Sequence, residues 1–320
     1  MYSTVLARMS PAKLDIRKLL QALEGERFYY APNTGNAGDG LIAYATLQLF
    51  RRLSLTWTHL RDPWDAAELP QGQTVVLGGG GHMCRHWNGF ATLASRIHRR
   101  ANRLVILPHT IEGNDAILAD FGPNVDFVCR EETSYHHVAA RAGAGCRVHL
   151  SDDMAFHLDV EAALRRNLDA WFKAKRSLKP SRARMHLRRL GHELRYGGMQ
   201  RWFRGRDAMP VLNCFRTDEE AAGWDIPDDN FDASAFFSSA DGRYGEADAI
   251  QSGGTFVRYI NQFSVLNTDR LHVGIAGALL GKQVNLYVND YFKINAVYEV
   301  SMRQRFPNVS LVERSAAVSP

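Results

Sequence analysis

Short apolar runs alternate with amphipathic stretches along most of the chain. Each run spans four or five residues, and several end at glycine, proline or asparagine, as strands buried in a sheet do. The predicted strands are residues 28–31, 74–77, 104–107 (stopped by Pro108), 125–129, 147–150, 211–215, 263–266 and 284–288, and the predicted helices include 41–53, 89–100 and 130–141. Strands that alternate with helices predict an α/β fold with parallel sheets covered on both faces.

A basic segment interrupts this alternation. Residues 161–206 carry 14 Lys and Arg against 3 acidic residues, whereas the rest of the chain carries 25 basic and 31 acidic residues. This segment alone makes the protein basic. A chain of 320 residues is long enough for two cores. We therefore predict an N-terminal α/β domain over 1–160, a basic, aromatic-containing insertion or linker over 161–207 and a C-terminal α/β domain over 208–320.

The composition predicts a cytoplasmic protein. Hydrophobic residues make up 45% of the chain and charged residues 23%, which is ordinary for a globular domain. The first 20 residues lack the apolar core of a secretory signal, and no apolar run approaches the roughly 20 residues that cross a bilayer. The four cysteines are scattered without a CxxC pair, as expected of free thiols in a reducing compartment.

The most informative stretch follows the predicted strand at 263–266. Asp269, Arg270 and His272 are expected in the first turn of a helix rich in small residues, which Gly281 ends. An acid, an arginine and a histidine are thus concentrated where a strand passes into a helix, the edge of α/β sheets where ligands bind. The backbone amide groups at a helix N-terminus and an arginine side chain are able to bind an anion there. We predict an active site at this edge.

Two glycine-containing loops lie at equivalent places in the N-terminal half. The loop at 33–40 reads NTGNAGDG, whose Asn33, Asn36 and Asp39 are able to bind hydroxyl groups; a tight turn capped by Asp39 is the alternative. It lacks the GxGxxG spacing of dinucleotide folds, so the sequence does not support NAD binding. The loop at 78–81 is four glycines, which favours close approach of a ligand or tight packing between domains.

Single residues at strand ends are ambiguous by themselves. His109 follows Pro108 and is either structural or catalytic, while Arg216 ends a strand and is able simply to pair with Asp218. The sequence has neither HExxH nor Cys/His ligand spacing, so no metal site is predicted; Asp152 and Asp153 are more consistent with a helix cap than with a cation site. No GxSxG elbow of a hydrolase occurs.

Together, six motifs resemble the polysaccharide pyruvyl transferase family, in its bacterial exopolysaccharide ketalase form. They occur in the family's order and read NTGNAGDGLI, VVLGGGG, ILPHTI, VCREETS, LSDDMAF and NTDRLHVGIAGALLGKQV. The resemblance implies transfer of pyruvate from phosphoenolpyruvate to two hydroxyls of one sugar, giving a cyclic ketal and phosphate. It also implies a GT-B-like fold, in which two Rossmann-like domains with parallel sheets face a central cleft. No cofactor is implied beyond this co-substrate, and a divalent cation is unsupported.

The resemblance also assigns residues to the donor. Arg216, Arg270, Leu271, His272 and His109 match family positions around phosphoenolpyruvate. Two arginine forks suit its carboxylate and phosphate, and a histidine suits protonation of its methylene carbon, a transfer worth about 10²–10⁴-fold in rate.

We therefore assign His272 as general acid and Arg216 and Arg270 as the anion clamp. His109 is a second acid/base or phosphate contact, and Asp269 orients Arg270 or caps its helix. Lys293 adds positive charge or is an ordinary surface lysine. The residues expected to face the acceptor sugar are Asn33, Asn36, Asp39, Gly79 and Gly80.

The composition of the basic segment does not decide which partner it binds. Trp171, Phe172, Met199, Trp202 and Phe203 lie among its arginines, a composition that suits a membrane interface, nucleic acid or a solvated insertion. Because the implied acceptor is lipid-linked, we expect residues 164–206 to bind an anionic, cytoplasmic membrane face. We expect no nucleic acid. The alternatives are a GT-B glycosyltransferase with a nucleotide-sugar donor and a nucleic-acid-binding protein.

Overall fold

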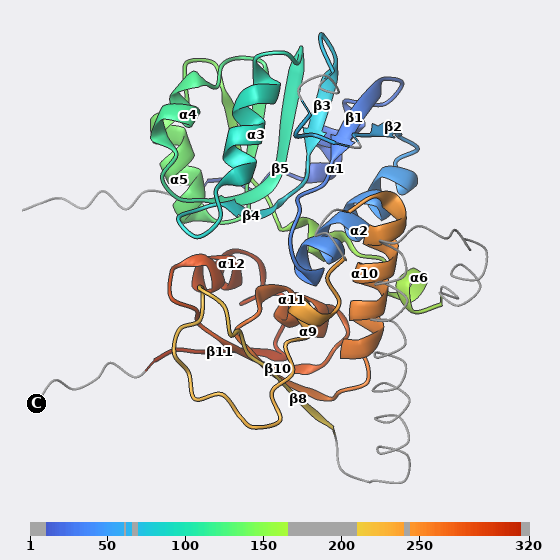
Figure 1. The fold of residues 1–320 in the computed structure, drawn as a ribbon, viewed down its shortest axis with the longest axis vertical. Coiled ribbons are helices and arrows are strands. Elements are labelled where there is room, and N and C mark those ends of the chain that lie inside the picture. The colour runs from blue at the N-terminus through green and yellow to red at the C-terminus, as the bar shows by residue number, and fades with distance from the viewer. Residues whose placement is uncertain (1–10, 61, 66–69, 166–209, 240–243, 315–320) are drawn as a thin grey trace, which may run out of the picture.

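The computed structural model describes residues 11–60, 62–65, 70–165, 210–239 and 244–314 (Figure 1). Within these residues, no helix is both long and apolar enough to cross a membrane. The described chain forms two parallel sheets with helices packed against them, a mixed α/β architecture of the Rossmann-like kind.

The N-terminal half is built on a sheet of seven parallel strands. The strand order is β2-β1-β3-β5-β6-β7, with β4 paired to β5. All residues of β3 and β6 are buried, as the apolar runs predict for strands covered on both faces. The strands are β1 (Arg27–Ala31), β2 (Thr56–His59), β3 (Thr74–Leu77), β4 (Gly80–Met83), β5 (Arg103–Ile111), β6 (Val125–Cys129) and β7 (Arg147–Leu150). The helices are α1 (Ile16–Gln21), α2 (Ala37–Arg52), α3 (Gly89–His98), α4 (Asp115–Asp120), α5 (Glu132–Arg141), the 3-10 helix η1 (Met154–His157) and α6 (Val160–Arg165).

The C-terminal half is built on a smaller parallel sheet of four strands in the order β11-β10-β9-β8. Its strands are β8 (Val211–Cys214), β9 (Val265–Thr268), β10 (Gln283–Tyr287) and β11 (Val309–Val312). Its helices are α9 (Ala233–Phe236), α10 (Glu246–Ile260), α11 (Leu271–Leu279) and α12 (Lys293–Ser301).

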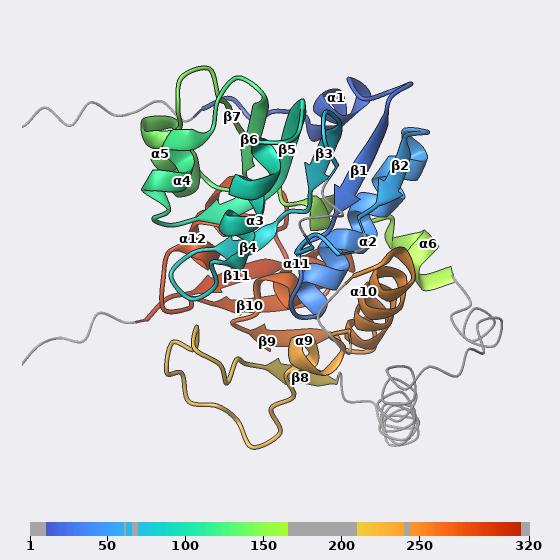
Figure 2. The ribbon, with the colours of Figure 1, turned by 45° about the horizontal axis from the view of Figure 1, so that its top comes forward.

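The two halves share a core through α2 and α10, which lie side by side in Figures 1 and 2. The contact is close because glycines face each other: a Cβ on Gly253 of α10 would lie 2.8 Å from the carbonyl oxygen of Gly40 in α2. One continuous cluster of buried apolar residues includes Tyr44 of α2, Ile250 of α10 and Leu266 of β9. The packing of these helices fixes how the two sheets face each other.

Several predicted boundaries are wrong, among them the strand at 263–266, which the structure places at Val265–Thr268. Strand β5 continues through Pro108 to Ile111, because the register shifts between Ile106 and His109 and a bulge accommodates a residue without an N–H. Helix α11 begins at Leu271, so the acid and arginine before it lie outside its first turn. Helix α2 begins at Ala37 rather than near Leu41, and Asn36 is its N-cap.

The domain boundaries at 160 and 208 stay predictions. Of the basic segment at 161–206, residues 161–165 belong to α6. The remainder, on which the membrane and nucleic-acid interpretations depend, lies outside the described residues.

Candidate active site

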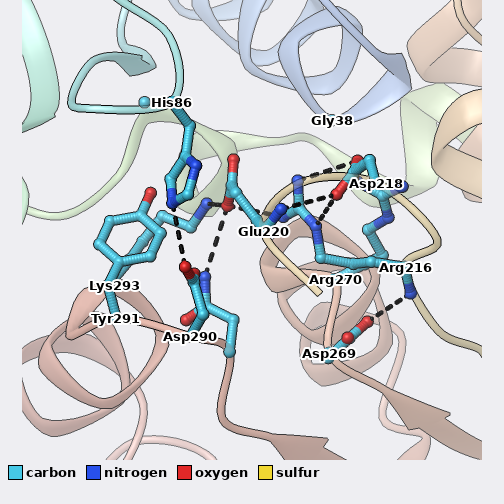
Figure 3. Close-up of polar contacts among 12 residues, drawn as sticks. Gly38, His86, Arg216, Asp218, Glu220, Asp269, Arg270, Asp290, Tyr291 and Lys293 are labelled. Carbon is cyan, nitrogen blue, oxygen red and sulfur yellow. Dashed lines mark hydrogen bonds and ion pairs between the residues drawn. The ribbon is translucent and has the colours of Figure 1, made fainter. Parts of the chain in front are cut away.

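A cavity of about 310 Å³ lies where the two halves meet. Its charged side chains are mostly on the C-terminal side, and Figure 3 shows several of them converging. The N-terminal half contributes Gly35, Asn36, Asp39, Gly81, His82, Trp87 and Arg130 to the lining, and the C-terminal half contributes Arg216, Asp218, Glu220, Ser234, Ala235, Ser238, Arg270, Leu271, His272 and Lys293.

The C-terminal lining comes from the carboxyl ends of three neighbouring parallel strands. Arg216 follows β8, Arg270 and His272 follow β9, and Lys293 opens the helix after β10. Thr268 joins two of these ends, since its Oγ1 donates to the carbonyl of Cys214 (2.7 Å) and accepts from the backbone N–H of Arg270 (2.9 Å). The sheet edge that the sequence predicts as the site is therefore the edge that lines the cavity.

The sequence predicts that Asp269 orients Arg270 or caps its helix, but its carboxylate binds a backbone N–H group instead. Its Oδ1 accepts a hydrogen bond from the backbone N–H of Arg216 (2.8 Å), and it lies outside the cavity lining. Helix α11 has no side-chain cap. Burial raises the pKa of Asp269 to about 6, against the opposing effect of the Arg216 N–H. Asp269 thus fixes the distance between the ends of β8 and β9.

Carboxylates pair with both arginines of the predicted clamp. Asp218 accepts from Nε of Arg216 (2.7 Å), and its Oδ2 lies 2.9 Å from Nη1 of Arg270 (Figure 3). Arg216 also contacts Glu220 (2.8 Å), and Arg270 contacts Asp232 (3.1 Å). Both guanidinium side chains are only 5% exposed, whereas that of Asp218 is 34% exposed. The carboxylate shared by the two arginines is therefore the one that reaches solvent.

Lys293 is buried and lines the cavity, so the surface-lysine alternative is wrong. Its Nζ pairs with Glu220 and lies 5.0 Å from the ring centre of Tyr291. Burial lowers the pKa of Lys293 to about 8, although the Glu220 carboxylate opposes the shift. The lysine charge in this cavity therefore responds to mildly alkaline pH.

His272 lies opposite a buried acid from the other half. Its Nε2 is 3.5 Å from Oδ2 of Asp153, which also accepts from Nη1 of Arg130 (2.7 Å). The other oxygen of Asp153 accepts from the N–H of Ala155 (2.8 Å), so the acid also caps the 3-10 helix η1. Burial alone would raise the pKa of Asp153, but His272 and Arg130 lower it below its usual range. Asp153 is therefore a carboxylate that faces the imidazole.

The imidazole of His272 also packs against a glycine. A Cβ on Gly38 would lie 2.5 Å from its Nδ1, so only glycine at this position of α2 leaves room for the ring. The glycine-containing loop of the N-terminal half therefore admits a side chain of the C-terminal half into the cavity.

His109 lies behind the cavity wall and not among the lining residues. It is fully buried, stacks on Phe90 with ring centres 5.2 Å apart, and its Nε2 accepts from the backbone N–H of His82 (3.3 Å). Burial lowers the pKa of His109 well below its usual value, and the nearby Arg130 adds to the effect. A neutral imidazole in this place supports the backbone of His82.

The residues predicted to face the acceptor divide into two groups. Asn36 and Asp39 line the cavity, and each also caps α2: Asn36 accepts from the N–H of Gly38 (2.8 Å) and Asp39 from that of Asn36 (3.1 Å). Asn33 lies behind them and donates to Asp39 (2.9 Å).

Gly79 and Gly80 also lie outside the lining. A Cβ on Gly79 would come within 2.6 Å of the carbonyl oxygen of Pro108, and Gly80 adopts φ +148° against Asn33. At these two positions the close approach is packing within the N-terminal half, neither the ligand contact nor the packing between domains that the sequence predicts, and Gly81 is the glycine of this loop that reaches the cavity.

A family model described as polysaccharide pyruvyl transferase matches residues 36–195. The chain belongs to this family. The match covers the N-terminal loops with Asp39, His82, Arg130 and Asp153. A family whose name specifies pyruvyl transfer to a polysaccharide implies a transferase with a saccharide acceptor.

Similarity to a solved structure covers both halves of this pyruvyl transferase family member. A crystal structure of a functionally uncharacterised protein from Klebsiella pneumoniae subsp. pneumoniae NTUH-K2044 is 27% identical with a TM-score of 0.70. The similarity covers 94% of this chain and 97% of that one. Comparison with curated proteins gives no match.

Sequence reasoning missed several lining residues and assigned others only to caps. Arg130 and Asp153 lie in motifs that carried the family resemblance, so the motifs were a signal for them. His82 follows the four glycines directly. Asp218 appeared only as a partner of Arg216, and Glu220 and Trp87 had no recognisable pattern. Within the described residues, no group of three or more His, Cys, Asp or Glu side chains is arranged to hold a metal ion.

Proposed function

We propose that this chain transfers the pyruvyl group of phosphoenolpyruvate to two hydroxyls of one sugar in an exopolysaccharide precursor, forming a cyclic ketal and releasing phosphate. The observation that carries the proposal is the convergence of Arg216, Arg270, Lys293 and His272 on one cavity. Three fixed cations beside an imidazole suit a small donor with several negative charges. The two halves with a cavity between them support a GT-B-like arrangement with the donor in the cleft.

The donor anions would take the place now occupied by a carboxylate of the protein. Asp218 bridges Arg216 and Arg270 and is the most exposed of the acids paired with the cations. A carboxylate or phosphate of the donor that displaced it would find two arginine forks already oriented by Glu220 and Asp232. This arrangement supports the proposed anion clamp.

The reaction needs one proton delivered and two hydroxyl protons removed. His272 donates a proton to the methylene carbon of phosphoenolpyruvate, and the first sugar hydroxyl forms a C–O bond to the adjacent carbon as it loses its proton. The bond from that carbon to the phosphate oxygen then breaks, and the second hydroxyl closes the ketal. One hydroxyl proton replaces the proton that His272 gave, and the other leaves with phosphate. Asp153, facing Nε2, stabilises the imidazolium that starts the sequence.

The proposal extends to a lipid-linked acceptor at the cytoplasmic face of the membrane. Residues 164–206 combine arginines with aromatic residues, which suits anionic headgroups. Pelleting with vesicles of phosphatidylglycerol and phosphatidylcholine tests this extension. Binding that is absent at low salt, or unchanged when residues 164–206 are deleted, would contradict it without affecting the donor assignment.

A thermal-shift and calorimetric titration with phosphoenolpyruvate, beside UDP-glucose, tests the donor. A ligand that binds only the native state raises the melting temperature by mass action. We expect stabilisation by phosphoenolpyruvate, lost in Arg270→Lys, which keeps the charge but not the fork, and retained in Arg303→Ala, whose side chain is 59% exposed. Stabilisation by UDP-glucose alone would instead identify a glycosyltransferase.

A further inference from the structure

An exposed tryptophan stands in the lining of the cavity. Trp87 is 39% exposed, and only four large hydrophobic side chains of the described residues are exposed to this degree. The others are Trp64, Val211 and Ile226. A large aromatic face left in solvent at a cavity is characteristic of a binding surface.

The indole of Trp87 is held in place despite its exposure. Its Nε1 donates to Oε1 of Glu220 (3.0 Å), and its ring stacks on His82 with centres 5.9 Å apart and planes at 24°. Its backbone exchanges two hydrogen bonds with Cys84, of 2.9 and 3.1 Å. Little conformational entropy is therefore lost when a ligand packs on the free part of the ring.

Trp87 belongs to the N-terminal wall of the cavity, although its Nε1 bonds to Glu220 of the C-terminal wall. Besides Arg130, the N-terminal wall carries His82, Asn36 and Asp39, which offer hydrogen-bonding groups beside an aromatic face. A pyranose ring has this combination of chemistry: an apolar face of C–H groups, which the negative face of an indole attracts, and a rim of hydroxyls. The polyanionic donor has no such apolar face, so Trp87 fits the acceptor.

A second exposed indole packs at the start of α3. Trp64 is 38% exposed, and its ring contacts Gly89, where a Cβ would lie 3.4 Å from Cη2. Gly89 begins α3 two residues after Trp87, so the Trp64 ring packs on the same short segment of chain that carries Trp87. Two exposed indoles held by one short segment suit consecutive sugar units better than a single monosaccharide.

We propose that Trp87 binds the pyranose ring that receives the pyruvyl group and that Trp64 binds the adjoining sugar of the acceptor. The identity of the ligand as an acceptor rests on the proposed function; the carbohydrate platform itself rests on the two indoles. A mono- or oligosaccharide of hexopyranoses is the chemical class that the platform takes.

Saturation-transfer difference NMR with methyl β-galactopyranoside, methyl β-glucopyranoside and methyl α-mannopyranoside tests the Trp87 subsite. We expect transfer to the ring C–H protons of at least one glycoside from wild type and from Trp87→Phe, and about tenfold weaker binding in Trp87→Ala. Both variants lose the bond to Glu220, so only the aromatic face distinguishes them. The control Ile226→Ala removes another exposed hydrophobic side chain, outside the cavity. No transfer from wild type, or equal transfer from Trp87→Ala, would overturn the subsite.

Methyl β-lactoside extends the experiment to the second tryptophan. We expect saturation of both rings in wild type and of one ring only in Trp64→Ala; equal saturation of both rings in the variant would overturn the distal position. Phosphoenolpyruvate titrations of the same proteins separate this proposal from the donor assignment. If the protein binds sugar but not phosphoenolpyruvate, the proposed function is wrong and the carbohydrate platform is supported. If it binds phosphoenolpyruvate but not sugar, the platform is wrong and the donor assignment is supported.

Discussion

Oδ2 of Asp153 lies 3.5 Å from Nε2 of His272, across the junction of the two halves of the molecule. Asp153 follows the last strand of the seven-stranded sheet, and His272 lies in the first turn of a helix on the four-stranded sheet. The acid is itself fixed by Arg130 and by the N–H of Ala155. The proposed proton donor is therefore complete only when the two halves are packed together.

Replacing Asp153 with asparagine tests this pairing. We expect Asp153→Asn to lower kcat for pyruvyl transfer by about 10²-fold, because an amide does not stabilise the imidazolium, while the Kd of phosphoenolpyruvate stays within about threefold. Steady-state kinetics and calorimetry measure the two quantities. Asp152→Asn is the matched control, since its carboxylate contacts Lys13 and Ser301 instead. An unchanged kcat in Asp153→Asn would show that His272 does not depend on this acid.

The carboxylate of Asp218 competes with the donor for the arginine clamp. It contacts Arg216 and Arg270, and its partial exposure leaves it free to be displaced. We expect Asp218→Asn to lower the Kd of phosphoenolpyruvate by about threefold to tenfold, the worth of a partly screened ion pair. Calorimetry provides the measurement, and Asp229→Asn, which removes the charge of a carboxylate that contacts Asn213 outside the cavity, is the control. Weaker binding in Asp218→Asn would mean that Asp218 orients the clamp and does not compete with the donor.

Donor binding should weaken at alkaline pH because of Lys293. Its pKa is lowered to about 8, mainly by burial, so the cavity loses a positive charge as the pH rises through that value. The Kd of phosphoenolpyruvate should rise by up to about tenfold per pH unit above pH 8, where the donor's phosphate, with a second pKa near 6, is already ionised.

Titrations between pH 7 and 9.5 measure this dependence. Lys293→Met should bind more weakly at pH 7 and show a flat profile. Lys282→Met is the control, because Lys282 is also partly buried but contacts the carbonyl of Asn261 outside the cavity. A wild-type profile that stays flat to pH 9.5 would exclude Lys293 from the donor site.

The sequence predicts those strands and strand-end residues that a local pattern of residues determines. Strands β3 and β6 are buried on both faces, so their apolar runs identify them, whereas β2 is partly exposed and its TWTH sequence carries no such signal. Arg216 and Arg270 each lie two residues after the end of a strand, and so a parallel sheet places them at one edge.

Contacts between residues of the two halves are not indicated by a local sequence pattern. The Asp153–His272 pair depends on how α2 and α10 orient two sheets. His109 lies within β5 and not after its end, fully buried and outside the cavity lining. The glycines at 78–81 predict close approach of a ligand or of the other domain, whereas the groups that approach Gly79 and Gly80 are Pro108 and Asn33 of the same half.

Gly38 should matter for catalysis more than for stability. A Cβ at this position would lie 2.5 Å from Nδ1 of His272, so Gly38→Ala has to push the imidazole away from its place beside Asp153. Alanine also favours the first turn of α2 by up to about 1 kcal/mol relative to glycine, which offsets part of the clash.

We therefore expect kcat to fall by about 10²-fold in Gly38→Ala, since a 1 Å displacement of a reacting group has this effect, with little change in melting temperature. Gly122→Ala is the matched control, because a Cβ there meets nothing closer than 3.9 Å. Kinetics and thermal unfolding of both variants decide the matter. Full activity in a folded Gly38→Ala protein would show that the reaction does not require His272 in its present position.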